Sequence, residues 1–411
     1  MLDIEVATAD PARLRHATRD ELSLALMDAR NHTLRGIAAC EAALGGAALT
    51  VPELPEIDPP LWTLGHIAWF QEIWIARNLQ RQRGELADAA APKLASILPE
   101  ADRCFDAVAV PHAARWSAPL PDLQLLRQYA MDTLETTLEL LAGTPADDDA
   151  LYFYRLALFR EDQAAEAMAT LAQRVGFDAG FRPRPAAHTP RPPLLFPATP
   201  WVLGGSRGGF TWANERGARP VALPEFEIDA QAVSWAQYAE FVEDGGYDDP
   251  RHWGAAGWAW VQAQGRRTPR FVDQMRQGVL QQRFGKLVRV PMTHPAVHIS
   301  WHEADAWCRW AGRRLPSEVE WEAAAFQGAS RGMRWGEVWE WTANTFRLYE
   351  GHPTATAPAR PFDESCVGLG HAKVLRGASW ATRDRLRFAK VRRARPPEHG
   401  HGFCGFRSCA P

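Results

Sequence analysis

The chain has 411 residues, more than one ordinary hydrophobic core accommodates, so its length indicates two or three domains. Its 46 Lys and Arg against 49 Asp and Glu give a net charge of -3, which argues against a general nucleic-acid binder. No uncharged apolar run approaches the roughly 18 residues of a membrane span, and the start of the chain lacks a signal peptide's apolar stretch. The 6 cysteines are scattered as in a protein with reduced thiols, so we expect a cytoplasmic protein without membrane partners.

Residues 1–176 are predicted to be helical. Capping, first-turn and stop signals delimit amphipathic segments at about 18–44, 59–81, 122–142 and 147–176. The first segment opens on a capping box formed by Thr18 and Glu21, and the third stops at Gly143. Four amphipathic helices joined by turns make a four-helix bundle the simplest arrangement.

Residues 177–200 contain seven prolines and no apolar periodicity, which predicts a stiff linker and a domain boundary. In residues 201–411, short apolar pieces alternate with Gly, Pro and Asp, which indicates a mixed α+β domain held together by loops. Helices are expected at 302–312 and from Ser317, where Glu320 completes a second capping box.

Four motifs in the C-terminal part occur in a fixed order and spacing. They are HPAVHISWHEADAWCRWAGRRLPSEVEWEAAA (294–325), WGEVWEWTAN (335–344), VLRGASWATR (374–383) and GFRSCA (405–410). In this order they resemble the formylglycine-generating-enzyme-like fold, an α+β domain of the sulfatase-modifying factor and C-type-lectin type. The resemblance implies this fold for the C-terminal part, but no cysteine follows the GAS motif until Cys404, so formylglycine-generating activity itself is not expected.

Three further segments narrow the resemblance. They are LWTLGHIAWFQEIWIARN (61–78), YFYRLALFREDQAAEA (152–167) and VSWAQYAEFVEDGGYDD (233–249). With the C-terminal motifs they resemble the nonheme-iron ergothioneine and selenoneine synthases, in which a DinB-type four-helix bundle precedes the formylglycine-generating-enzyme-like domain. GHIAWFQE and GFRSCA look closest to the selenoneine synthases. The resemblance implies an oxidoreductase that uses oxygen to join sulfur or selenium to hercynine (trimethylhistidine), a small-molecule substrate held in an interdomain pocket.

The same resemblance implies Fe(II) bound by three histidines, and here the sequence departs from it. His66 matches the first ligand, but Arg160 and Ala164 occupy the two positions of the HxxxH pair on the fourth helix. A guanidinium stays protonated and has no lone pair for a metal, and Gln163 offers only a weak amide ligand. The neighbouring acids are expected to be solvated or to pair with arginine rather than to bind metal: Glu161, Asp162 and Glu166. The two substitutions therefore predict that the iron site is degenerate.

Substrate and catalytic positions can also be carried over from the resemblance. Phe346 stands where some ergothioneine enzymes have a catalytic tyrosine, and Tyr349 follows three residues later. The substrate-binding candidates are Arg115, Arg393, Arg395 and His399. In the tail, Arg393 stands where the family has Asn, and clustered guanidiniums suit carboxylate or phosphate better than a quaternary ammonium.

Three readings remain open from the residues. The chain is an active sulfur- or selenium-inserting synthase, a diverged paralogue that binds a small anionic ligand, or a non-catalytic partner of a true synthase. The sequence indicates no oligomeric state. The thiols of Cys404 and Cys409 are interpreted as buried and inert. The side chains of His294, His298 and His302 are expected to diverge too far to bind one metal ion.

Overall fold

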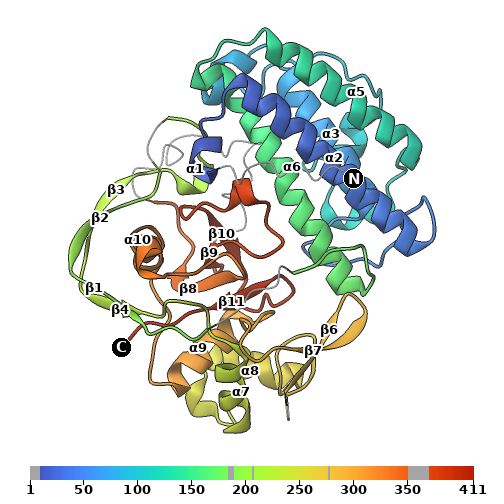
Figure 1. The fold of residues 1–411 in the computed structure, drawn as a ribbon. Coiled ribbons are helices and arrows are strands. Elements are labelled where there is room, and N and C mark those ends of the chain that lie inside the picture. Colours follow the sequence, from blue (N-terminus) through green and yellow to red (C-terminus); the bar gives the residue numbers. More distant parts are fainter. Residues whose placement is uncertain (1–9, 184–188, 206–207, 276–277, 350–369) are drawn as a thin grey trace.

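The structure is a computed structural model that describes residues 10–183, 189–205, 208–275, 278–349 and 370–411. The long helices of the N-terminal part lie together on one side of the molecule, and the sheets and shorter helices of the C-terminal part lie on the other (Figure 1). Helix α6 (Asp148–Val175) runs along the boundary between the two parts. Arg160 and Ala164 lie on this helix, and Arg393 contacts it through Glu166.

The four long N-terminal segments form helices that pack against one another: α2 (Arg19–Leu44), α3 (Pro60–Gln71), α5 (Leu123–Ala142) and α6. The predicted capping box of α2 is confirmed, because Thr18 accepts from the Glu21 N–H and Glu21 bonds back. Shorter helices are α1 (Pro11–Leu14), α4 (Ala101–Phe105), η2 (Arg81–Leu86) and η3 (His112–Trp116).

The second predicted helix, 59–81, is wrong at its end. After Gln71 the chain widens into a single π-helical turn, η1 (Glu72–Ala76), and regular helix does not resume. The carboxylate of Glu72 is buried there and accepts hydrogen bonds from Tyr129 Oη at 2.6 Å and from the Ile97 N–H at 2.7 Å. These partners come from distant segments, so apolar periodicity alone could not locate the end of the helix.

A four-stranded sheet forms the centre of the C-terminal part, with strand order β10-β9-β8-β11. Its strands are β8 (Trp339–Thr345), β9 (Lys373–Gly377), β10 (Arg392–Arg395) and β11 (Cys404–Phe406), of which β8 and β11 are parallel. Around it lie α7 (Trp235–Glu243), α8 (Ala255–Gln264), α9 (Trp301–Trp310) and α10 (Glu318–Gln327). The predicted helices at 302–312 and from Ser317 are therefore confirmed, each with a capping box.

Three smaller antiparallel sheets complete the C-terminal part. They pair β1 (Leu194–Phe196) with β4 (Phe226–Ile228), β2 (Thr199–Leu203) with β3 (Arg219–Leu223), and β5 (Val272–Gln274) with β6 (Val279–Arg283) and β7 (Lys286–Val290). Strand β1 and the start of β2 thus fall inside the proline-rich segment 177–200. The end of this segment therefore belongs to the C-terminal part, because it pairs with strands β4 and β3. Proline is compatible with such short edge strands.

The central sheet presents opposite faces to α6 and to α10, because alternate residues of a strand point to opposite sides. Trp339 donates through Nε1 to Glu166 of α6 at 2.7 Å. Its neighbour Glu340 instead accepts from Trp321 of α10 at 2.8 Å. The same alternation separates Arg392 from Arg393 on β10.

The cysteine thiols that the structure describes are buried, and burial raises the pKa of Cys404 to about 12. This agrees with the prediction of inert thiols for Cys404 and Cys409, whereas Cys366 lies outside the described residues. In the part of the chain that the structure describes, no helix combines the length and apolar character that a membrane crossing requires.

The core of the N-terminal part contains a buried ion pair. Arg30 Nε lies 2.9 Å from Glu161 Oε1, and both residues are at most 2% exposed. Removing one member of such a pair leaves the other charge desolvated and uncompensated.

We therefore expect Arg30→Met to lower the free energy of unfolding by about 3–5 kcal/mol, because Glu161 would remain buried without its partner. Urea denaturation followed by circular dichroism measures this. The matched control is Arg127→Met, which removes a partly exposed pair with Glu41 and should cost less than about 1 kcal/mol. Equal costs for the two variants would contradict the assignment.

Candidate functional site

The two parts of the chain meet at a buried carboxylate in the middle of α6. Glu166 lies 2.8 Å from Arg393 Nη2 and accepts hydrogen bonds from Ser379 Oγ at 2.5 Å and Trp339 Nε1 at 2.7 Å. Burial opposes the ionisation of Glu166, but Arg393, Ser379 and Trp339 together hold its pKa below the usual value. The carboxylate therefore joins α6 to two strands of the C-terminal part, β10 and β8, and to the loop after β9.

A second acid of α6 makes a parallel connection. Asp162 accepts from Arg385 Nε at 2.5 Å and Nη2 at 3.0 Å, and Arg385 also bonds Asp28 of α2 at 2.8 Å. Burial raises the pKa of Asp162, although Arg385 opposes the shift. With the pair of Arg30 and Glu161, these contacts confirm that the acids of this helix pair with arginine.

His66 lies on α3 in an aromatic setting close to this interface. Its ring stacks on Trp62, with centroids 4.6 Å apart, and its Nδ1 lies 2.9 Å from the Phe105 carbonyl oxygen. The Arg115 guanidinium also lies over the Trp62 ring, 4.0 Å from its centroid, and forms an ion pair with Asp58 at 2.6 Å. The structure thus brings Arg115 and His66 onto the same tryptophan.

The two positions at which the resemblance places histidine ligands face α3, the helix that carries His66. Arg160 and Ala164 are one turn apart on α6, and both are half-buried, as is Gln163. The Arg160 guanidinium lies 5.6 Å from the centroid of Phe70, which is one turn after His66 on α3 and 6.1 Å from its ring. The face of α6 that would carry the histidine pair therefore points at the helix that carries His66.

The residues present do not fit a three-histidine iron centre. Arg160 has no lone pair to donate, Ala164 has no donor atom, and only His66 matches the expected ligand set. Within residues 10–183 and the other described ranges, no group of three or more His, Cys, Asp or Glu side chains could hold a metal ion.

Two further candidates, Arg395 and His399, lie in the C-terminal tail, in β10 and in the loop after it. Arg395 donates to the Ala394 carbonyl at 2.9 Å, and no carboxylate of the described chain lies within ion-pair distance of its guanidinium. Burial and the nearby Arg393 lower the pKa of Arg395. His399 Nδ1 lies 2.7 Å from Glu56, in the segment between α2 and α3. Burial opposes the ionisation of Glu56, but His399 and Arg395 lower its pKa to about 2.

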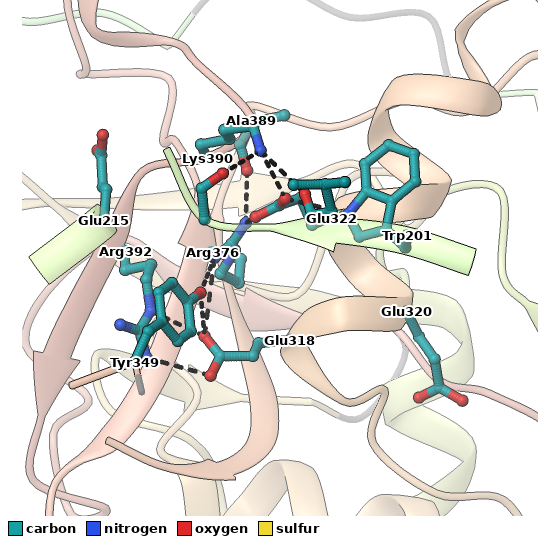
Figure 2. Close-up of polar contacts among 12 residues, drawn as sticks. Trp201, Glu215, Glu318, Glu320, Glu322, Tyr349, Arg376, Ala389, Lys390 and Arg392 are labelled. Carbon is teal, nitrogen blue, oxygen red and sulfur yellow. Dashed lines mark hydrogen bonds and ion pairs between the residues drawn. The ribbon is translucent and has the colours of Figure 1, made fainter. Parts of the chain in front are cut away.

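Tyr349 and Phe346 lie on the other side of the central sheet. Figure 2 shows Tyr349 beside Arg392, Arg376 and Glu318, and its hydroxyl lies 3.1 Å from Glu318 Oε2. The Arg392 guanidinium lies 3.9 Å from the Tyr349 centroid and 4.7 Å from that of Phe346. Since Arg392 and Arg393 point to opposite faces of β10, the structure does not bring these aromatic residues together with Arg393 and Arg395. Their catalytic role remains a prediction from the resemblance.

The site contains residues that the sequence did not single out. Glu56 and Asp58 connect the tail and Arg115 through one short segment, by the contacts to His399 and Arg115. Trp62 lies between Arg115 and His66. Trp62 could have been found from the sequence, because it lies one turn before His66 on a predicted helix. Glu56 and Asp58 could not, because they lie in an irregular connection without a recognisable pattern.

Replacing Glu166 with Gln tests the electrostatic connection. Because its folded-state pKa is lowered, its ionisation stabilises the fold above the unfolded-state pKa of about 4.3 and this stabilisation is lost as the pH falls through the lower folded value. We expect Glu166→Gln to cost about 3 kcal/mol at pH 7, with the difference from wild type shrinking below pH about 4. Urea denaturation at several pH values measures this, with exposed Glu135→Gln as control. A difference that is independent of pH would contradict the assignment.

Comparisons with known proteins agree with this architecture. The chain is 31% identical over 422 residues to the hercynine oxygenase of Mycolicibacterium smegmatis, covering 89% of this chain and 92% of that protein. It is 30% identical to the hercynine oxygenase of Mycolicibacterium thermoresistibile over 88% of each chain. The formylglycine-generating enzyme of Streptomyces coelicolor is 29% identical over 56% of this chain and 93% of its own length.

A family model described as a Sulfatase-modifying factor enzyme 1-like domain matches residues 186–335, most of which lie in the C-terminal part. These comparisons confirm the predicted kind of C-terminal domain and the predicted membership of an ergothioneine-related enzyme family. The chain belongs to the hercynine oxygenase family, with a helical N-terminal part joined to a Sulfatase-modifying factor enzyme 1-like domain.

Proposed function

We propose that this protein acts in ergothioneine-related metabolism and that its interdomain site binds a carboxylate-bearing small molecule of the hercynine type. In this proposal Arg160 replaces the metal as the fixed positive charge of the site. The relatives named hercynine oxygenase support the metabolic assignment, because they match nearly the whole chain.

The observation that carries the proposal is the position of Arg160. It occupies a ligand position of the resembled iron site and lies over Phe70, one turn from His66. A guanidinium forms paired hydrogen bonds with a carboxylate and is strengthened in this role where water is excluded. The half-buried Gln163 beside it adds an amide donor and acceptor.

The charges around the site favour a ligand that carries one carboxylate. Arg393 is largely compensated by Glu166 at 2.8 Å, and Arg115 by Asp58 at 2.6 Å. Arg395 has no such carboxylate partner among the described residues. In this proposal Arg395 and Arg160 meet the ligand carboxylate, while the Trp62 and Phe70 rings offer apolar faces to its other end.

An active synthase is the second candidate, in which oxygen-dependent chemistry joins sulfur or selenium to hercynine. Full-length similarity to the hercynine oxygenases and the retained His66 favour it. It requires Fe(II), which the resemblance implies and for which this chain offers one matching ligand. The two candidates differ in metal content and in product, so the same preparation distinguishes them.

The domain organisation belongs to the same proposal. We interpret the N-terminal helices as a DinB-type four-helix bundle over residues 1–176, followed by the linker 177–200 and the C-terminal domain 201–411. The mutual packing of α2, α3, α5 and α6 supports this interpretation. A small molecule in the interdomain site is the only class of partner that the proposal requires.

Metal analysis tests whether the site was lost by substitution. We expect the wild-type protein to bind no stoichiometric Fe(II) and Arg160→His/Ala164→His to gain about one equivalent, because two imidazoles one turn apart would join His66. The control, Glu135→His/Glu139→His, places the same spacing on the exposed face of α5 and should gain none. Equal iron in the wild type and in the Arg160 variant would show that the ligand positions are misassigned.

Ligand binding tests the role of Arg160. Titration calorimetry with hercynine should give saturable binding to wild type, and Arg160→Met should weaken it about tenfold or more, because a charge-assisted hydrogen bond is lost. Arg127→Met, a helix arginine outside the site, should leave the affinity unchanged. Hercynine consumption with formation of a C–S or C–Se product would instead favour the synthase, and absence of binding would contradict both candidates.

A further inference from the structure

A cavity lies beside the last turns of α6, away from Arg160. Its volume is about 200 Å³, and it lies between the last turns of α6, the β6–β7 hairpin and the loops that carry Trp380 and Phe403. Its lining includes Gln173 of α6, Gln281 and Arg283 of β6, and an aromatic group of Phe284, Trp380 and Phe403. None of the candidate site residues described above contributes to this lining.

The aromatic wall of this cavity is held in a conformation that costs free energy. The backbone φ angle is 49° at Phe284 and 66° at His298, which also lines the cavity. Residues other than Gly and Asn seldom adopt such positive values. Residues held in such conformations concentrate at functional sites. Phe284 lies edge-on to Trp380 with centroids 6.2 Å apart, and Trp380 lies 4.7 Å from Phe403.

Contacts with α6 hold the hairpin in place. The Gln173 amide donates to the Gln282 carbonyl at 2.7 Å and accepts from the Phe284 N–H at 3.0 Å. At the tip, Gly285 approaches Gly176 so closely that a Cβ on it would lie 2.1 Å from the Gly176 oxygen. The wall is therefore formed before any ligand arrives, which lowers the entropic cost of binding.

Hydrogen-bond donors without a matching acceptor gather at one end of the cavity. Gln281 is fully buried, and its Nε2 has no hydrogen-bond partner. Its amide orientation is fixed, because Arg283 Nε donates to Gln281 Oε1 at 2.8 Å and an arginine only donates. No carboxylate in the described ranges lies within ion-pair distance of Arg283, whose pKa is lowered by burial. The Gln281 amide and the Arg283 guanidinium are both hydrogen-bond donors, so an anionic acceptor placed between them would satisfy both.

We propose that this cavity binds a small aromatic carboxylate, with its ring against Phe284, Trp380 and Phe403 and its carboxylate at Gln281 Nε2 and Arg283. The volume suits such a molecule, since an apolar cavity of about 150 Å³ accommodates benzene. Two further charged side chains line the cavity, those of Glu337 and Arg387. Burial raises the pKa of Glu337, whereas the Arg387 guanidinium adds a positive charge to the lining.

Benzoate is the probe for this site. Titration of the full-length wild-type protein should give one saturable site, and nitrobenzene, which is planar and similar in shape but uncharged, should bind about tenfold more weakly or worse. No saturable benzoate binding up to about 10 mM would overturn the proposal, as would equal or tighter binding of nitrobenzene. Either result would indicate a cavity that holds only water or any apolar molecule.

Two adjacent glutamines provide matched variants. Gln281→Leu removes the buried donor and should weaken benzoate binding about tenfold or more. Gln282→Leu alters the exposed neighbour on the opposite face of β6 and should leave the affinity unchanged. Equal effects of the two variants would contradict the site. If Gln281→Leu does not fold, the comparison of benzoate with nitrobenzene on wild type still decides the question.

This site is independent of the proposed function. Arg160→Met should leave benzoate affinity unchanged, and Gln281→Leu should leave hercynine affinity unchanged, because the two ligands contact different faces of α6. Loss of both ligands in either single variant would contradict the separation of the two sites.

Discussion

The burial of charge along α6 is the constraint on which the arrangement of the two parts depends. A carboxylate removed from water is costly unless opposite charges and hydrogen-bond donors surround it. Glu166 and Asp162 find those partners in the C-terminal part, at Arg393, Ser379, Trp339 and Arg385. The helix cannot separate from the sheet without leaving these groups unpaired, so its contacts determine how the N-terminal helices meet the C-terminal fold.

Because α6 is held in this way, its faces have separate roles. With about 100° per residue, Arg160 and Ala164 lie about 40° apart, whereas Gln173 lies about 140° from Arg160 around the axis. One face points at His66 and Phe70 of α3, and another supports the β6–β7 hairpin and the aromatic cavity. The same helix thus presents Arg160 to α3 and Gln173 to the β6–β7 hairpin.

Much of the fold could be predicted from the sequence, and the reason is that the decisive signals are local. The capping boxes at Thr18 and Ser317 and the stop at Gly143 lie within one turn of the helix ends that they define. The end of α3 could not be predicted, because the buried Glu72 is satisfied by groups from distant segments. The strands within 177–200 were missed for a similar reason, since pairing with distant β3 and β4 forms them.

The sequence by itself indicated the family. Through that resemblance it also predicted that Arg160 and Ala164, one turn apart on one helix face, stand where the family has metal ligands, and neither side chain can bind a metal. Only the tertiary structure decided which candidate residues lie together. Strand alternation sends Arg392 to Tyr349 and Arg393 to Glu166, and Glu56 meets His399 across more than three hundred residues. The cavity beside Gln281 likewise has no sequence signature. Contacts between segments far apart in the chain depend on packing and strand register, which no local pattern encodes.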